Sequence, residues 1–168
     1  MLRVLLLTIV FAVLSRSPAA AQAGRSWVIS PGWAFLRVNS DADGWGFGPS
    51  LAIRRDFHVS PEVPRRWGVE LSASAPAFGN NAGGVATDLG ATLTWAGDRR
   101  EAGLAAGLTA FLVGDASEFV GGGVGGFVGG HATAWLGGNI GLFVEARGRL
   151  AAYGGPYLSG SAGAAIRL

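Results

Sequence analysis

The sequence predicts an all-β fold of eight antiparallel strands, and three observations lead to this prediction. Apolar residues alternate with small or polar residues in steps of two along most of the chain, which is the period of a β-strand. The alternation falls into eight segments of about 10–12 residues, separated by turn-like stretches. A long stretch without charged residues, 120–144, is too rich in glycine to favour a helix.

The stretch 120–144 could form either one membrane-spanning helix or two strands joined by a turn. It has no Asp, Glu, Lys or Arg, and its 25 residues are long enough to cross a membrane as one helix. However, ten of them are glycine, and each glycine costs a helix about 0.8–1 kcal/mol relative to alanine. With a period of two, residues 124–136 and 140–149 become two strands joined by Gly137-Gly138-Asn139. We therefore expect a hairpin.

The same alternation predicts the remaining strands. In chain order, these strands are 27–38, 44–55, 67–77, 85–95, 102–112 and 157–168. In the same order, their apolar rows include Trp27 and Trp33, Trp45 and Leu51, Trp67 and Leu71, Leu89 and Trp95, Leu104 and Leu108, and Leu158 and Ile166. Each opposite row consists largely of Gly, Ala, Ser and Thr. The connections are then 39–43, 56–66, 78–84, 96–101, 113–123, 137–139 and 153–156.

The first 23 residues predict a secretory signal peptide instead of a strand. Arg3 supplies a basic start, Val4 to Leu14 is a short apolar run, and small residues surround Ala21 and Ala23. The apolar run is too short to anchor the chain in a bilayer. We expect residues 1–23 to be a signal peptide that is cleaved, and residues 24–168 to form the mature domain.

Charge and cysteine content narrow the classes of function. All 13 basic residues are arginine, and loss of Arg3 and Arg16 with the signal leaves 11 arginines against 11 acidic residues. No basic stripe remains to bind nucleic acid. The chain has no cysteine, so no disulfide holds the exported domain together. Abundant alanine and glycine, with arginine in place of lysine, indicate a GC-rich bacterium with an outer membrane as the destination.

The composition of the two strand faces predicts a closed barrel. A sheet face that meets water should carry long polar side chains. The face opposite to the apolar row instead carries small residues with isolated charges. Small residues suit the crowded interior of an eight-stranded barrel, which leaves the apolar face for lipid. The predicted fold is an antiparallel up-and-down eight-stranded transmembrane β-barrel. We expect its lumenal charges to pair in a network of Arg54, Glu70, Asp88, Glu145, Arg147, Arg149 and Arg167.

Aromatic residues gather at the strand ends, as they do at the two interfaces of a membrane. The end expected to face the periplasm has Trp27, Trp67, Trp95 and Trp135, and the opposite end has Trp45, Phe47, Phe78, Tyr153 and Tyr157. Arg37 and Arg55 fall in the lipid-facing phase, but they too lie at strand ends, where an arginine that faces lipid costs little.

These features resemble the small bacterial outer-membrane β-barrels of the OmpA transmembrane, OmpX and opacity-protein type, over the whole of residues 24–168. The resemblance implies an outer-membrane location, contact with outer-membrane lipid, and delivery by the barrel-assembly machinery. In that family the last strand often ends in Phe, whereas here it ends in Leu168. We expect a structural or surface-interaction role without turnover, with the predicted loop 113–123 as the best surface for a partner.

Two alternatives stay open. His131 and Thr133 share one strand face, and Glu145 follows on the next strand, so the three supply the parts of a hydrolytic triad: an imidazole base, a hydroxyl nucleophile and an orienting carboxylate. This order resembles that of outer-membrane lipid A deacylases, with threonine in place of their serine. The other alternative is a secreted lipocalin-like barrel that binds a small apolar ligand inside. We expect no cofactor and no metal site, because a single histidine has no clustered partner. The oligomeric state is not predicted.

Overall fold

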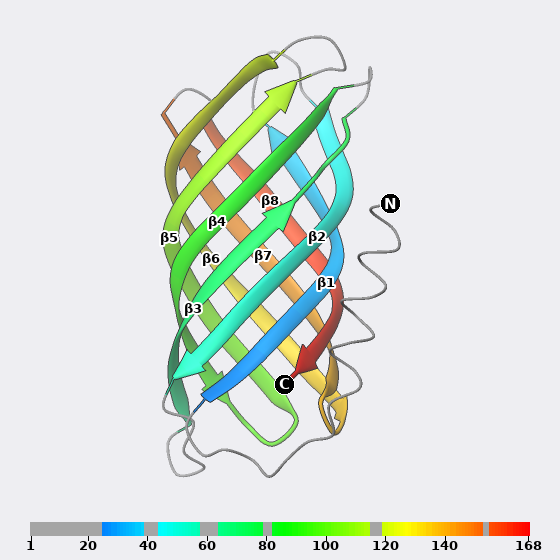
Figure 1. Ribbon diagram of the computed structural model, residues 1–168, viewed down its shortest axis with the longest axis vertical. Coiled ribbons are helices and arrows are strands. Elements are labelled where there is room, and N and C mark those ends of the chain that lie inside the picture. The colour runs from blue at the N-terminus through cyan, green and yellow to red at the C-terminus, as the bar shows by residue number, and fades with distance from the viewer. Residues whose placement is uncertain (1–24, 39–43, 58–63, 79–81, 115–118, 153–154) are drawn as a thin grey trace.

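A computed structural model shows eight antiparallel strands closed into one barrel (Figure 1). It describes residues 25–38, 44–57, 64–78, 82–114, 119–152 and 155–168. The strands are β1 (Arg25–Val38), β2 (Gly44–Phe57), β3 (Arg65–Ser74), β4 (Gly83–Ala96), β5 (Arg100–Gly114), β6 (Phe119–Gly137), β7 (Ile140–Ala151) and β8 (Gly155–Arg167). Each strand pairs with the next, and β8 pairs with β1 to close the barrel. The predicted strand number, order and closure are confirmed.

The barrel is longer than it is wide, and its strands are tilted (Figure 1). We call the end where β1 begins and β8 ends the lower end, as in Figure 1, and the opposite end the upper end. The predicted signal peptide lies outside the described residues. Among those residues there is no helix with the length and hydrophobicity needed to cross a membrane.

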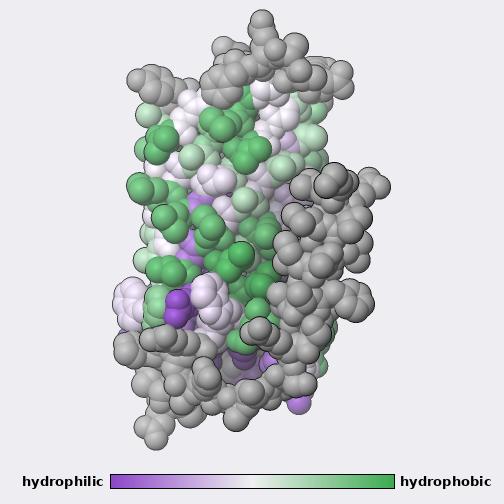
Figure 2. Space-filling model, viewed as in Figure 1, coloured by the Kyte–Doolittle hydropathy of each residue, from purple (hydrophilic) through white to green (hydrophobic). Residues whose placement is uncertain are grey.

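The predicted assignment of faces is confirmed by exposure. On β5, Leu104, Leu108 and Leu112 are 55%, 65% and 52% exposed, while the intervening Ala105 and Thr109 are buried. Apolar residues also cover much of the wall that is visible in Figure 2. The barrel therefore presents large apolar side chains outward and keeps small and polar ones inside, the reverse of a water-soluble barrel.

Several strands are longer than the alternation predicts. The predicted loop 113–123 is wrong, because β5 continues to Gly114 and β6 begins at Phe119, with a register shift between Val113 and Gly114. Gly121, Gly122 and Gly123 pair with 111–113 inside the sheet. Glycine has no side chain, so a run of glycines shows no alternation of apolar and polar residues. The sequence pattern therefore cannot predict that β6 continues through these glycines. Similarly, β2 extends to Phe57 and β5 begins at Arg100.

β3 is shorter than predicted, since it ends at Ser74 and not at Ala77. Pro76 has no N–H to donate to a ladder. Beyond it, Ala77 forms isolated bridges with Phe47 and Gly83, including a 2.8 Å hydrogen bond from its N–H to the Phe47 carbonyl. The chain therefore leaves the regular strand but stays against the upper rim of the barrel.

The glycine-rich stretch forms the predicted hairpin. β6 ends at Gly137 and β7 begins at Ile140, which leaves Gly138 and Asn139 as the turn. Gly138 has a φ of 54°, a conformation that two-residue hairpin turns require and that glycine adopts without strain. This stretch therefore forms two strands and not one membrane helix.

Two groups of buried apolar side chains pack inside the barrel. The upper cluster consists of Leu36, Ala86, Phe111, Ala151 and Tyr157, with Phe78 and Val113 packed against it. A second apolar group, nearer the lower end, consists of Val28, Trp135, Phe143 and Ala165.

Candidate functional site

The middle of the lumen is organised around Arg147. It lies on β7, is 2% exposed, and donates hydrogen bonds to carboxylates from three strands. Its Nη1 lies 2.8 Å from Asp88 Oδ2, its Nε lies 2.6 Å from Glu145 Oε1, and its Nη2 also contacts Glu70. Its guanidinium also lies 4.9 Å from the centre of the Phe127 ring. One arginine thus links β3, β4 and β7 across the barrel.

Arg149 adds a second cation to this site. Its Nε and Nη2 donate to the two oxygens of Asp88 over 2.9 and 2.5 Å, a paired geometry that favours a fixed orientation. Its Nη1 contacts the Ser159 hydroxyl, and the guanidinium lies 5.7 Å from the centre of the Tyr157 ring. We call Glu70, Asp88, Glu145, Arg147 and Arg149 the central cluster.

A second group of charges lies toward the lower end, around Glu101 on β5. This carboxylate is 2% exposed and accepts hydrogen bonds from Arg54, at 3.0 Å, from Arg66, at 3.1 Å, and from Arg167. Arg54 also forms an ion pair with Asp56 at 3.1 Å. We call Arg54, Asp56, Arg66, Glu101 and Arg167 the lower cluster.

The structure therefore places all seven predicted lumenal charges inside the barrel and divides them between two clusters. Arg54 and Arg167 belong to the lower cluster, and the other five form the central cluster. Sequence reasoning missed Asp56, Arg66 and Glu101, because each lies in a segment predicted to be a connection. A signal was available: all three keep the parity of the inward row of the adjoining strand.

The residues of the hydrolase hypothesis all face inward, but the polar atoms of His131 and Glu145 have other partners. His131 pairs with Glu145 in the β6–β7 register, yet its Nε2 lies 2.6 Å from Arg54 Nη1 and 3.5 Å from Thr94 Oγ1. Arginine can only donate, so Nε2 is the acceptor of this bond. Arg147 binds both oxygens of Glu145, each over 2.6 Å. Thr133 is 5% exposed.

The aromatic residues divide more sharply than the sequence predicts. Trp27, Trp67 and Trp95 at the lower end, and Trp45 and Phe47 at the upper end, are between 38% and 61% exposed on the outer wall. The predicted girdle positions of Trp135 and Tyr157 are wrong, since these side chains are 6% and 2% exposed inside the barrel. Phe78 is also turned inward, against the upper cluster. Tyr153 lies outside the described residues.

The inward aromatic residues have a packing role. Arg167 lies 4.0 Å from the centre of the Trp135 ring, so this ring covers the lower cluster. Tyr157 contacts Phe111 at a ring separation of 5.0 Å and closes the lumen above Arg149. An aromatic ring that caps a buried guanidinium stabilises it by a cation–π interaction.

Little space is left between these groups. A lumenal cavity of about 20 Å³ lies beside Glu145 and Arg149, along a wall of serines on β1, β2, β3 and β8. This volume is close to that needed for one water molecule. Among the described residues, no three His, Cys, Asp or Glu side chains form a group suited to a metal ion. The arrangement is chemically a filled, ion-paired core.

Comparisons with known proteins agree with this architecture at the level of the fold. No family model matches the sequence, and no curated protein matches it. Among solved structures, the chain is similar to Ail, the attachment invasion locus protein of Yersinia pestis, with a TM-score of 0.62 at 13% identity over 88% of this chain and 100% of that chain.

Two further structures show the same similarity. Neisserial surface protein A has a TM-score of 0.56 at 17% identity over 86% of this chain and 98% of that chain. The N-terminal β-barrel domain of Pseudomonas aeruginosa OprF has a TM-score of 0.54 at 14% identity over 86% and 98%. The chain therefore has the fold of the small eight-stranded outer-membrane β-barrels.

Proposed function

We propose that this chain is a bacterial outer-membrane β-barrel protein whose role is structural or surface interaction, without turnover. The observation that carries the proposal is the inverted distribution of side chains. Leu108 on the outer wall is 65% exposed, whereas Arg147 inside is 2% exposed. In water this arrangement would expose most of the apolar surface and bury the charges, whereas in a bilayer both groups find suitable surroundings.

Cell fractionation tests this proposal directly. We expect the protein in the outer-membrane fraction, with an unboiled band in detergent that migrates faster than the boiled one because the closed barrel stays compact. Recovery in a soluble periplasmic or secreted fraction would contradict membrane insertion. The lipocalin-like alternative would then be favoured, and a bound apolar ligand should be sought.

The absence of turnover is proposed because the candidate triad is engaged elsewhere. Nε2 of His131 accepts from Arg54, and both oxygens of Glu145 are bound by Arg147. A base that activates Thr133 needs its lone pair free. We expect unchanged lipid A in cells that express the chain. Altered lipid A that reverts with His131→Ala would instead support the hydrolase.

The expected partners are also part of this proposal. We propose that the barrel-assembly machinery recognises β8 together with Leu168. We also propose that the connections at the upper end contact external partners. Because β5 ends at Gly114 and β6 begins at Phe119, we propose that a partner would contact 115–118 and the adjoining strand ends, instead of the whole of 113–123. A Leu168→Asp variant should accumulate less of the compact unboiled band, because a charge replaces the apolar terminus. Equal assembly would argue against recognition of this residue.

A further inference from the structure

A groove of about 490 Å³ indents the outer wall over β4, β5, β6 and β7, toward the lower end. We call it the lower groove. Small outward residues form its floor and large ones form its walls. The floor consists of Ala102 on β5 with Ala132 and Ala134 on β6, and the walls consist of Trp95 on β4 with Leu142 and Val144 on β7. A volume of this size lies within the range of small-molecule sites, about 300–1,000 Å³.

The register between the strands explains the shape of the lower groove. Trp95 pairs with Ala102 on β5, which pairs with Ala132 on β6. Ala132 in turn pairs with Val144 on β7. Side chains that lie directly opposite one another on neighbouring strands are in contact range. Two adjacent methyl groups therefore lie between an indole ring and a branched side chain, and a hollow remains above them.

A cation forms the lower end of this groove. Arg100 lines the groove, is exposed on the outward row of β5, and pairs with Ala134 of the floor. A second exposed outward arginine, Arg65 on β3, pairs with Trp95 of the wall. Among the described residues, neither arginine forms an ion pair, even though Asp98 is exposed in the turn between β4 and β5. Both guanidinium groups are therefore available to an external anion.

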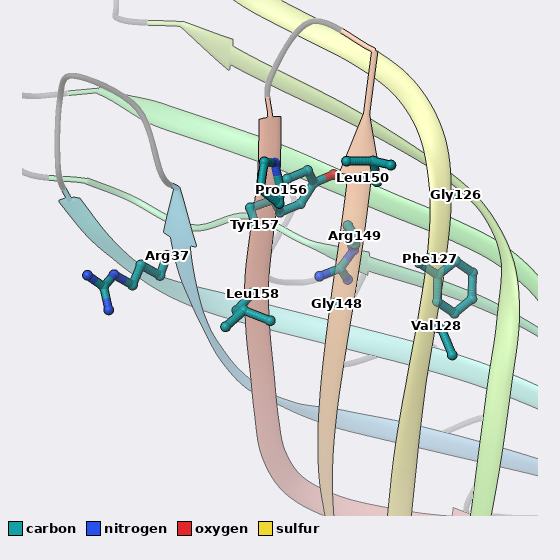
Figure 3. A pocket seen from close by; sticks show the side chains of 10 residues that line it. All are labelled: Arg37, Gly126, Phe127, Val128, Gly148, Arg149, Leu150, Pro156, Tyr157 and Leu158. Atoms are coloured by element: carbon teal, nitrogen blue, oxygen red, sulfur yellow. The ribbon is translucent and has the colours of Figure 1, made fainter.

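A larger groove on the same barrel lacks this arrangement. It measures about 690 Å³, lies over β6, β7 and β8 toward the upper end, and has Leu150 and Leu158 in its walls (Figure 3). We call it the upper groove. The arginine at its edge, Arg37, points away from it, and its guanidinium lies 5.5 Å from the centre of the Trp45 ring on β2 (Figure 3). Of the two grooves, the lower one combines an apolar floor with an outward cation.

The lower groove also lies where a bilayer places its headgroups. Trp95 is one of the outward tryptophans of the lower end, with Trp27 and Trp67, and tryptophan is enriched at membrane interfaces. The two arginines are the first residues of their strands, Arg65 of β3 and Arg100 of β5. A guanidinium can bind a phosphate through two parallel hydrogen bonds, and basic residues at a membrane surface attract anionic lipids.

We propose that the lower groove binds one anionic phospholipid, with its headgroup phosphate at Arg100 and one acyl chain over Ala102 and Ala132. The proposal rests on the proposed membrane insertion. The acyl chain would be held more tightly than lipid elsewhere on the wall, because its methylene groups fill the hollow above the alanines. Arg65 adds a second positive charge beside the headgroup, so a lipid with a net negative charge is favoured over a zwitterionic one.

The test uses the full mature chain in vesicles that contain equal amounts of phosphatidylglycerol and phosphatidylcholine. Retained lipid is counted by native mass spectrometry after extraction into detergent. Ala132→Leu fills the hollow, and we expect it to reduce retained phosphatidylglycerol about tenfold, because the acyl chain loses its apolar seat. Ala106→Leu is the matched control, since Ala106 is an exposed outward alanine of β5 that lines neither groove. It should retain lipid like the parent.

Other variants separate the headgroup contact from the acyl contact. Arg100→Gln should lower the ratio of retained phosphatidylglycerol to phosphatidylcholine about fivefold, without changing the compact band of the barrel. Arg37→Gln, which removes an outward arginine at the upper end, is its matched control and should leave this ratio unchanged. Ala102→Val adds two methyl groups to the floor and should lower retention about threefold, which keeps the test decisive if Ala132→Leu does not fold.

Several outcomes would overturn the proposal. Equal retention by folded Ala132→Leu and the parent would remove the lower groove as a lipid site, as would equal losses in Ala132→Leu and Ala106→Leu. Equal ratios in Arg100→Gln and Arg37→Gln would remove the headgroup contact. Loss of a crosslinked dimer in Ala132→Leu, with lipid retained, would assign the groove to a second copy of the chain. A parent protein that never inserts into vesicles would overturn the proposed function as well, whereas the other outcomes leave it intact.

Discussion

Arg54 and Arg55 are neighbours on β2, yet they occupy opposite environments. Arg54 points inward, is 5% exposed and has Asp56, Glu101 and His131 as partners. Arg55 points outward at the lower end and lies 5.0 Å from the centre of the Trp27 ring and 5.5 Å from that of Phe57. The side of the wall on which an arginine lies therefore determines its partners: carboxylates neutralise it inside, and aromatic rings shield it outside.

This difference has an energetic consequence. An inward arginine neutralises carboxylates that are buried with it, so its removal leaves these carboxylates without a counter-charge. An outward arginine at a strand end can reach the headgroup layer, so its removal costs mainly its contact with a ring. Substitutions inside and outside the wall should therefore differ in cost, and the following experiments test that expectation in order of size.

The largest expected effect is that of Arg147→Met. Glu70, Asp88 and Glu145 would lose their shared cation, and breaking a buried ion pair from one side costs about 3–5 kcal/mol. The free energy of unfolding should fall by that amount, measured by urea titration of the barrel in phospholipid vesicles. A loss below about 1 kcal/mol would show that the central cluster is hydrated and contributes little.

The second effect concerns the depth of the outer wall. Leu108 lies near the middle of β5, and Leu108→Arg should lower the free energy of unfolding by about 2–4 kcal/mol, because a charge would face the hydrocarbon. Leu112→Arg, four residues nearer the upper end on the same outward row, should cost only about 0–1 kcal/mol. Equal costs at the two positions, in the same vesicle titration, would contradict the proposed position of the membrane.

The third effect compares inward and outward glycine. A Cβ on inward Gly107 would lie 2.2 Å from the Leu89 carbonyl oxygen, while one on outward Gly130 would lie 3.4 Å from the nearest atom. Gly107→Ala should therefore cost about 1–3 kcal/mol, as overpacked sites do. Gly130→Ala should stay within about 0.5 kcal/mol of the parent. Thermal shift of the compact band on unboiled gels would rank the two variants, and a reversed order would contradict the close packing of β4 against β5.

The smallest effect completes the comparison between the two neighbours. Arg55→Met removes the contact with the Trp27 and Phe57 rings, which contributes about 0.5–1 kcal/mol at an exposed site. Urea titration should show a loss of this size and no more. A cost as large as that of Arg147→Met would mean that Arg55 has a buried anionic partner.

The sequence alone determined the strand count and which face of each strand points outward. Leu104, Leu108 and Leu112 reveal the period of β5 without any knowledge of their neighbours, because successive side chains alternate by local geometry. The turn at Gly138 was equally predictable, since its conformation favours glycine and depends on a few adjacent residues. These features are local, so the pattern of one strand is sufficient.

Tertiary structure decided everything that depends on how distant strands align. Which groups the inward rings of Trp135 and Tyr157 contact was decided by closure: Trp135 on β6 packs over Arg167 of β8, and Tyr157 on β8 packs against Phe111 of β5. Glu101 is the centre of the lower cluster because β5 begins at Arg100 and the closed barrel brings arginines from β2, β3 and β8 to this carboxylate. The physical reason is that alternation is fixed within a strand, whereas the register between strands, and hence the choice of ion-pair partners, is fixed only by closure of the barrel.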